Sequence, residues 1–190
     1  MKLIALVKGT KDKIYFLDPM HQIHNNTNDY AWQLTGINGT KQVKSNTGRR
    51  RLNIIGALDP LTLEPIIILT ESNCNKELLV SYLTHVKEQN RDSAIIYVVL
   101  DNAGYNKSHE VKEVAKSLGI ELIFLPPYCP NLNLIERLWR YFKKKVMKNK
   151  YYQTFEEFEY NITLFFKNLM TNIDELKSLL TLNFGIIKAS

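Results

Sequence analysis

Three acidic residues follow apolar segments in a pattern that could bind metal ions. Asp18 ends the run IYFLD, Asp101 ends AIIYVVLD, and Glu136 follows the proline-rich LPPYCPNLNLI. Open α/β sheets bind ligands outside the carboxyl ends of their strands, so we expect the two aspartates side by side, with Glu136 entering from a helix. Three carboxylates repel one another, and Mg²⁺ or Mn²⁺ neutralises such hard oxygen ligands best. Two such ions about 3.5–4 Å apart can activate water and stabilise the leaving oxygen of a phosphodiester.

Each acid also has a purely structural interpretation. Asp18 precedes Pro19, and an Asp-Pro pair commonly forms a turn. Asp101 begins the segment DNAG, which could simply lead a strand into a loop. Glu136 lies three residues after Asn133, where a glutamate can close a capping box at the start of a helix. For Glu136 considered alone, the cap is the favoured interpretation.

The elements that must position these acids follow from the hydrophobic periodicity. Short apolar runs between turn residues predict strands, and apolar residues spaced by three and four predict helices. The predicted strands lie at 14–18, within 49–60, and at 64–71, 94–101 and 120–125, with a further candidate at 30–34; the predicted helices lie at 75–90, 108–119, 131–148, 154–170 and 174–180. The first strands can pair as an antiparallel meander, and the later strand–helix–strand units need parallel crossovers. We therefore expect an α/β fold: a mixed five-stranded sheet with helices on both faces and a helical C-terminus.

Composition and charge narrow the function classes. The 190 residues, 45% hydrophobic and 23% charged, suit one domain with a core at about 14–150 and C-terminal helices at 151–190. Lys+Arg 25 against Asp+Glu 19 gives a net charge of +6, which favours a polyanionic partner such as DNA. The two cysteines form no CxxC pair and indicate a reduced, cytoplasmic protein. Neither a membrane span nor a signal peptide is expected from the apolar runs.

Basic side chains near the acids predict contacts with phosphate. One cluster consists of three consecutive arginines, Arg49, Arg50 and Arg51. In the predicted helix 131–148, Arg140 and Lys143 share a face with Glu136. The other side of that helix carries an apolar stripe that should face the core: Leu132, Ile135, Trp139, Phe142 and Val146. A solvated charged face is an equal alternative for both basic groups; bound to DNA, they would set affinity and salt dependence rather than sequence preference.

Other polar and aromatic residues near the acids carry weaker signals. Asn102, beside the second aspartate, could orient metal ligands or water. His21 and His24 form HQIH, but no cysteine or further histidine completes the four ligands that Zn²⁺ prefers, so a transition-metal site is disfavoured. Trp32 is expected to pack in the sheet rather than stack on a base.

The segments FLD, LDNAGYNKS and LPPYCPNLNLIERLWRYFKK together resemble the catalytic domain of mariner-type DDE transposases, in their bacterial insertion-sequence branch. In that family two aspartates and the glutamate of LPPYSPxLNPIExxW bind the metal. Asp18, Asp101 and Glu136 match those positions, and the 34 residues between the last two are characteristic of the family. The resemblance covers about 14–150 and implies an RNase H-like fold and two Mg²⁺ (or Mn²⁺) ions per site. It also implies cleavage of DNA at transposon ends and transfer of the 3′-OH to target DNA.

The sequence departs from the family pattern without losing a proposed ligand. Pro19 stands where relatives often have glutamate, Tyr105 lies near a frequent histidine, and Cys129 and Leu134 replace the commoner serine and proline. Relatives also carry an N-terminal helix-turn-helix domain that is absent here, so recognition of transposon ends is expected to be missing or supplied by a separate partner chain, with a dimer forming on DNA. Two alternatives stay open: a stand-alone RNase H-like endonuclease, and an inactive remnant that only binds DNA or a partner.

Overall fold

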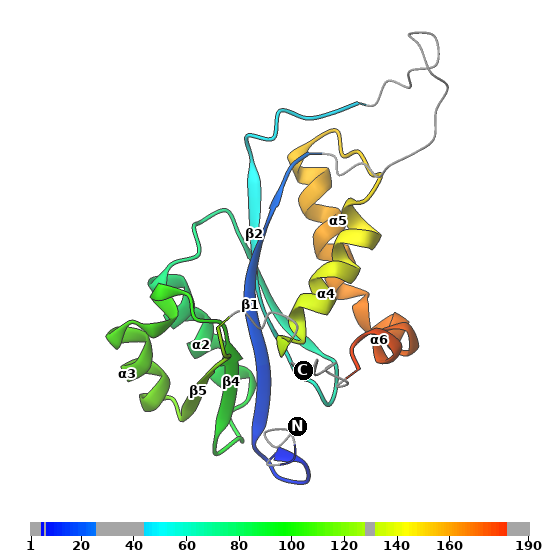
Figure 1. Ribbon diagram of the computed structural model, residues 1–190. Coiled ribbons are helices and arrows are strands. Elements are labelled where there is room, and N and C mark those ends of the chain that lie inside the picture. Colours follow the sequence, from blue (N-terminus) through cyan, green and yellow to red (C-terminus); the bar gives the residue numbers. More distant parts are fainter. Residues whose placement is uncertain (1–4, 6, 26–43, 128–131, 182–190) are drawn as a thin grey trace, which may run out of the picture.

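A single mixed sheet forms the centre of the structure, a computed structural model that describes residues 5, 7–25, 44–127 and 132–181 (Figure 1). Its strands are β1 Lys13–Ile23, β2 Arg51–Leu58, β3 Pro65–Thr70, β4 Ile96–Leu100 and β5 Ile120–Phe124, in the spatial order β3-β2-β1-β4-β5. β2 pairs antiparallel with β1 and β3, whereas β1, β4 and β5 run parallel. The predicted mixed five-stranded sheet is therefore confirmed. The candidate strand at 30–34, with Trp32, lies outside the described residues.

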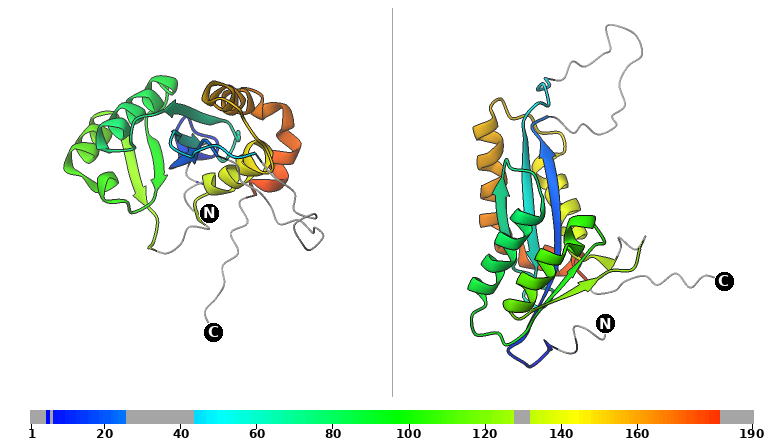
Figure 2. Two further views of the ribbon diagram at one scale, coloured as in Figure 1. Left: turned by 90° about the horizontal axis from the view of Figure 1, so that it is seen from above. Right: turned by 90° about the vertical axis from the view of Figure 1, so that its left-hand side faces the viewer.

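Helices cover both faces of this sheet, as the sequence predicts (Figure 2). On one face lie α2 Lys76–Gln89 and α3 His109–Ser117, whose apolar sides close a core with β4 and β5. On the other lie α4 Ile135–Phe142, α5 Phe155–Lys167 and α6 Ile173–Leu179, which close a second core over β1 and β2. Within the described parts of the chain, no helix is long and apolar enough to cross a membrane.

Strand β1 is longer than predicted, and Asp18 does not end it. The strand continues past Asp18 because it remains paired with β2 as far as the pair Ile23–Arg51. No Asp-Pro turn forms, so that structural interpretation of Asp18 is wrong. The ladder with β4 covers only Lys13 to Phe16, which leaves the later part of β1 paired on one side within the described chain. Proline is tolerated on such an edge, which explains why Pro19 does not interrupt the strand.

The predicted helix at 131–148 is interrupted after one regular segment. α4 ends at Phe142 and passes into a π-helical turn, η4 Lys143–Met147. The predicted core stripe is buried except for Leu132, which is half-buried, and Leu138 and Tyr141 widen it. π-Helical turns of this kind occur often at functional sites.

Close packing between α4 and the sheet depends on a glycine in β2. An ideal Cβ built on Gly56 would lie 2.6 Å from Cη2 of Trp139 and 2.9 Å from Cδ1 of Ile67. Real Cβ atoms essentially never come so close, so only glycine lets the indole lie on the strand at this position.

Replacing Gly56 with alanine is therefore expected to lower the free energy of unfolding by about 1–3 kcal/mol, because the added methyl group must displace packed side chains. Urea denaturation followed by circular dichroism measures this loss. Gly104→Ala is the matched control, since a Cβ on Gly104 meets no atom within 4 Å. Equal destabilisation of both variants would contradict the packing described here.

Candidate active site

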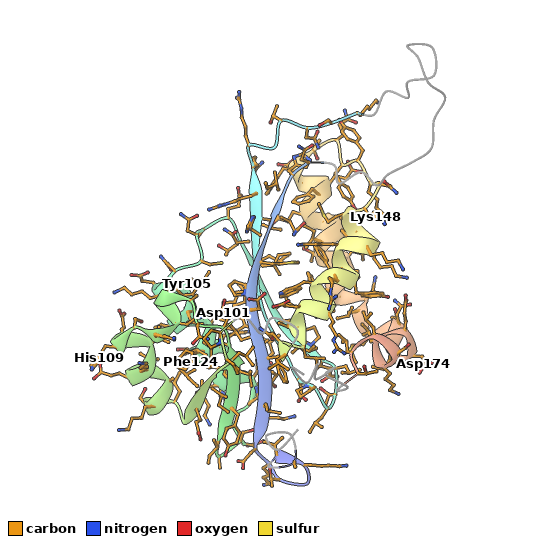
Figure 3. The ribbon with its side chains drawn as sticks, in the orientation of Figure 1. Asp101, Tyr105, His109, Phe124, Lys148 and Asp174 are labelled. Carbon is orange, nitrogen blue, oxygen red and sulfur yellow. The ribbon has the colours of Figure 1, made fainter. Side chains whose placement is uncertain are left out.

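The three predicted acids lie near enough for their charges to act on one another, and Figure 3 shows one of them, Asp101, on the connection after β4. Asp101 directly follows β4, and Glu136 lies in the first turn of α4. Phe16 of β1 pairs with Val99 of β4 in a parallel ladder, so two residues further on Asp18 lies level with Asp101. The charges of Asp101 and Glu136 both act on Asp18, and that of Asp101 acts on Glu136.

Asp18 is held by a tryptophan from the opposite layer. Its Oδ2 accepts a hydrogen bond from Nε1 of Trp139 at 3.1 Å. Burial is the main cause that raises the pKa of Asp18 to about 7, and the negative charges of Asp101 and Glu136 raise it further. The hydrogen bond from Trp139 and the charge of Lys143 oppose this shift. The sequence pattern predicted Trp139 only as a core residue, so its polar role was missed.

Asp101 is held by the short helical turn that follows it. Its Oδ1 accepts hydrogen bonds from Nδ2 of Asn106 at 2.7 Å and from the backbone N–H of Ala103 at 3.0 Å. Asn106 lies in η2 Gly104–Lys107 and is 1% exposed, with its Oδ1 unpaired among the described residues. Asn102, which we predicted as a ligand-orienting residue, instead donates its amide to the carbonyl of Leu125. The side chain that contacts Asp101 is thus Asn106, which no sequence signal singled out.

Glu136 takes no part in a capping box. The N-cap of α4 is Leu134, and no side chain caps the helix there. Asn133, the proposed capping partner, is buried and donates Nδ2 to the carbonyl of Leu17 in β1 at 3.2 Å. Burial raises the pKa of Glu136, the charge of Arg140 opposes the rise, and that of Asp101 adds to it. The carboxylate therefore remains available for chemistry.

The two predicted cations of α4 and η4 lie beside the acids. Both Arg140 and Lys143 are exposed, and their charges act on Glu136 and Asp18 respectively. These two exposed cations lie near the acid cluster, where they could neutralise the negative charge of a bound phosphate.

The three consecutive arginines have different surroundings. Arg50 pairs with Glu71 at 3.1 Å and Glu156 at 3.4 Å, and its guanidinium lies 3.6 Å from the ring centroid of Phe155. Arg51 donates to Oδ1 of Asn73. Arg49 is exposed. Arg50, the residue before β2, therefore links the start of that strand to α5 and to Glu71.

The two histidines of HQIH do not share a site. His24 bonds to the carbonyl of Tyr152 at 2.9 Å and to Asn46 at 3.0 Å, and its ring lies 5.2 Å from that of Phe158. His21 is exposed on β1. His24 thus has a structural role between β1 and α5, and the disfavoured transition-metal site finds no support.

The acid cluster has the right donors for a divalent cation but not a ready-made cage. Within the described residues, no three His, Cys, Asp or Glu side chains converge closely enough to hold a metal ion. Hydrogen bonds account for this, because the carboxylate of Asp18 accepts from Trp139 and that of Asp101 accepts from Asn106. The chemistry of the set still fits, because the charge of Asp101 raises the pKa of both Asp18 and Glu136, and a dication neutralises such hard oxygen donors.

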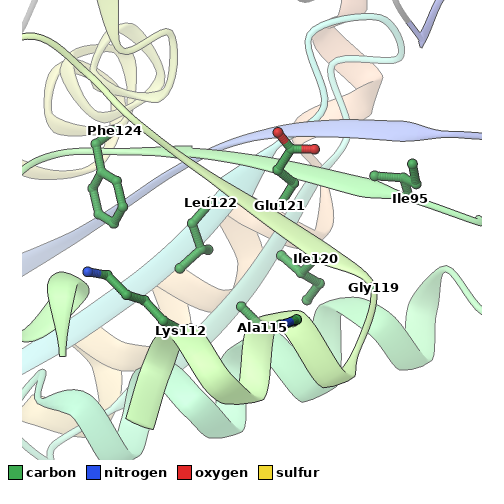
Figure 4. A pocket seen from close by; sticks show the side chains of 9 residues that line it. Ile95, Lys112, Ala115, Gly119, Ile120, Glu121, Leu122 and Phe124 are labelled. Atoms are coloured by element: carbon green, nitrogen blue, oxygen red, sulfur yellow. The ribbon is translucent and has the colours of Figure 1, made fainter. Parts of the chain in front are cut away.

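An apolar hollow of about 470 Å³ lies apart from the acids, between α3 and the edge strand β5 (Figure 4). Ile120, Leu122 and Phe124 point from the strand toward Lys112 and the helix. The described residues that line this hollow include no cluster of groups suited to catalysis, so the acid cluster is the better candidate site.

A family model described as DDE superfamily endonuclease matches residues 13–159. An uncharacterized protein, y4pE/y4sA, of Sinorhizobium fredii (strain NBRC 101917 / NGR234) is 26% identical over 84 residues, which make up 44% of this chain and 60% of that protein. The match to the family model covers the sheet, all three acids and the beginning of α5, up to residue 159.

Solved structures of Mos1 transposase share the fold. The paired-end complex with left transposon end has a TM-score of 0.67 at 14% identity and covers 87% of this chain and 52% of that chain. The mariner paired-end complex with Mn also gives 0.67, at 13% identity over 94% and 57%. The catalytic domain with Raltegravir and Mn gives 0.59, at 12% identity over 87% and 76%. The chain thus spans about half of the Mos1 chains in the complexes, and the predicted RNase H-like fold is confirmed.

The raised pKa of Asp18 predicts a loss of stability with rising pH in the metal-free protein. Between the ordinary value of 3.8 and about 7, the folded state keeps a proton that the unfolded chain has released, so stability falls across this window. Melting temperatures in EDTA from pH 4 to 8 measure the slope. Asp18→Asn should flatten it, whereas Asp92→Asn, at an exposed site, should keep the wild-type slope. An unchanged slope in Asp18→Asn would contradict the assignment.

Proposed function

This chain belongs to the DDE superfamily endonuclease family, and from that premise we propose that it is the catalytic domain of a DNA transposase. It would cut phosphodiesters at the ends of a mobile element and join the freed 3′-OH to target DNA. The observation that carries the proposal is that Asp18, Asp101 and Glu136 lie near enough in an RNase H-like fold for their charges to act on one another. Water or the DNA 3′-OH is the nucleophile, so the chain needs no nucleophilic side chain.

Asp18, Asp101 and Glu136 would hold Mg²⁺ or Mn²⁺, two ions per site. When bound, such ions supply an activated water and neutralise charge on the leaving oxygen. The similar Mos1 complexes solved with Mn and with Mg support this choice of metal. The mutual repulsion of the three carboxylates supports it independently, because a dication relieves that repulsion.

Neighbouring side chains orient the acids in this proposal. Trp139 fixes the rotamer of Asp18 through its N–H, and Asn106 fixes that of Asp101. Mutating a group that orients a metal ligand in this way typically lowers metal affinity or activity by about 10–100-fold. Burial around Asp18 excludes competing water and strengthens each interaction inside the site.

Exposed cations supply the DNA contacts that we propose. Arg140 and Lys143 flank the acids and would bind the phosphates on either side of the scissile bond. Arg49 and Arg51 would extend this contact along β2, and the +6 net charge favours DNA in general. The paired-end complexes of the similar Mos1 structures support a dimer on DNA.

Loss of one aspartate is expected to abolish DNA cleavage. Purified protein with Mn²⁺ should nick supercoiled plasmid, and Asp101→Ala should lower the rate at least about 100-fold, since removing a ligand exceeds the effect of removing its orienting partner. Gel electrophoresis of the plasmid measures nicking. Glu113→Gln, an exposed acid on α3, is the matched control and should cut normally. Equal or absent nicking in wild type and Asp101→Ala would overturn the catalytic assignment.

A plain endonuclease is the second candidate, and a precut substrate separates the two. An oligonucleotide duplex with a free 3′-OH should become joined to plasmid if the chain is a transposase. Nicking without joined product would favour the endonuclease, to which the same three acids and the same fold are suited.

Trp139→Phe is expected to lower Mn²⁺-dependent nicking by about 10–100-fold, because phenylalanine loses the N–H to Asp18 together with the indole atoms that pack on Gly56. The Mn²⁺ concentration at half-maximal rate should rise. Circular dichroism and urea denaturation check the fold. Wild-type metal dependence in this variant would show that the hydrogen bond does not orient Asp18.

A further inference from the structure

A polar groove of about 470 Å³ adjoins the acid cluster and is not used by the reaction described above. β1 lines it with Pro19, Met20 and His21, and β2 lines it with Arg51 and Asn53. The remaining lining residues come from the loop between β3 and α2 and from η2: Asn73, Cys74 and Tyr105. Its size is within the range of about 300–1,000 Å³ that is usual for ligand sites.

The groove and the carboxylate of Asp18 lie on opposite faces of β1. Side chains alternate along a strand, and Asp18 shares its face with Phe16 and Met20, in the core under α4. Pro19 and His21 belong to the other face. Past Asp18, β1 has no β4 neighbour in the described chain, because that ladder ends at the pair Phe16–Val99. A DNA strand that crosses this open edge would therefore touch the acids on one side and the groove on the other.

Charge coupling independently indicates how close the groove is to the acids. Burial raises the pKa of Tyr105 to about 12, and the charges of Asp101 and Asp18 add to the rise. Asp18 also raises the pKa of the Cys74 thiol, and Arg51 opposes it. Figure 3 shows Tyr105 just beyond Asp101 on the same connection after β4. The residues that line the groove are therefore immediate neighbours of the acid cluster.

The chemistry of the walls matches one nucleotide. Arg51 is exposed and is oriented by its bond to Oδ1 of Asn73, so its remaining N–H donors can reach a phosphate. His21 adds a second nitrogen donor on the same strand face. Tyr105 is half-buried and offers a ring on which a base or sugar can pack, opposite Pro19. A metal ion is not favoured here, because among the described lining residues no acid faces the cations.

We propose that this groove binds one nucleotide of a DNA strand, adjacent to the phosphate at the acid cluster. The phosphate of that nucleotide lies at Arg51 and His21, and its base or sugar packs on Tyr105. The assignment rests on the proposed function and adds a subsite that keeps the strand in line across the open edge of β1. Because stacking and phosphate contacts carry no base code, the subsite tolerates any sequence.

Cys74 provides a direct probe of occupancy. In a Cys129→Ser background it is the single cysteine of the chain, which has two. The probe is a mixed-sequence duplex with a 3′ single-stranded extension, with Ca²⁺ as the oxygen-seeking cation in place of Mg²⁺. At a DNA concentration ten times the Kd, maleimide alkylation of Cys74 should slow about tenfold. A cysteine placed at exposed Ser117 on α3, with Cys74→Ser, should react at the same rate with and without DNA.

Two matched pairs of variants test the walls. Tyr105→Ala should weaken DNA binding at least about fivefold, whereas Tyr105→Phe should keep it, because the ring remains. Arg51→Gln should weaken binding, whereas Arg91→Gln, which removes an exposed arginine after α2, should not. Fluorescence anisotropy of the labelled DNA measures affinity.

The outcomes separate the two proposals. DNA that binds or is nicked while Cys74 alkylates at its full rate would overturn the groove alone. Unchanged affinity in both Tyr105→Ala and Arg51→Gln would do the same. Neither DNA binding nor Mn²⁺-dependent nicking by the wild-type protein would overturn the groove and the proposed function together.

Discussion

The hydrogen bond from Trp139 to Asp18 joins the helical layer to the sheet at the point where the acids meet. The indole can reach that carboxylate only because Gly56, the β2 partner of Asp18, leaves room for its ring. Glu136 lies three residues before Trp139 on the same short helix, so the packing of the indole also sets the position of Glu136, the third acid. One packed side chain thus determines the relative positions of two carboxylates that lie 118 residues apart in sequence.

Electrostatics oppose this arrangement, and the surrounding groups relieve only part of the opposition. Burial and mutual repulsion disfavour the ionised form of Asp18, while a neutral N–H and one lysine favour it. Asp101 finds its donors in Asn106 and a backbone N–H instead of a cation. Among the described residues, few positive charges lie near these carboxylates, so the folded protein would be more stable with a bound dication than without one. Metal held by Asp18, Asp101 and Glu136 would therefore stabilise the folded protein.

The sequence predicts the elements well because hydrophobic periodicity is local. It failed where the deciding partner is distant: the length of β1 depends on its pairing with β2, which overrides the turn preference of Asp18-Pro19. Asn106 was missed, and Asn133 was assigned to a cap instead of its bond to β1, for a related reason, since a buried asparagine gives no periodic signal. The three acids were predicted from expected strand ends and from the family resemblance. Their hydrogen-bond partners could come only from coordinates, because those contacts join different layers.

Helix α4 lacks a stabilising N-terminal cap, and the residue before its N-cap contacts the strand that carries Asp18. A side-chain cap typically contributes about 1 kcal/mol, yet α4 begins without one. Asn133 could have supplied one through its Oδ1, but that oxygen stays buried without a hydrogen-bond partner in the described structure, while Nδ2 donates to the carbonyl of Leu17, the residue before Asp18. The start of the helix is thus tied to the strand that carries the first acid. Glu136 therefore closes no capping box, and its carboxylate stays close enough to Asp101 for that charge to raise its pKa.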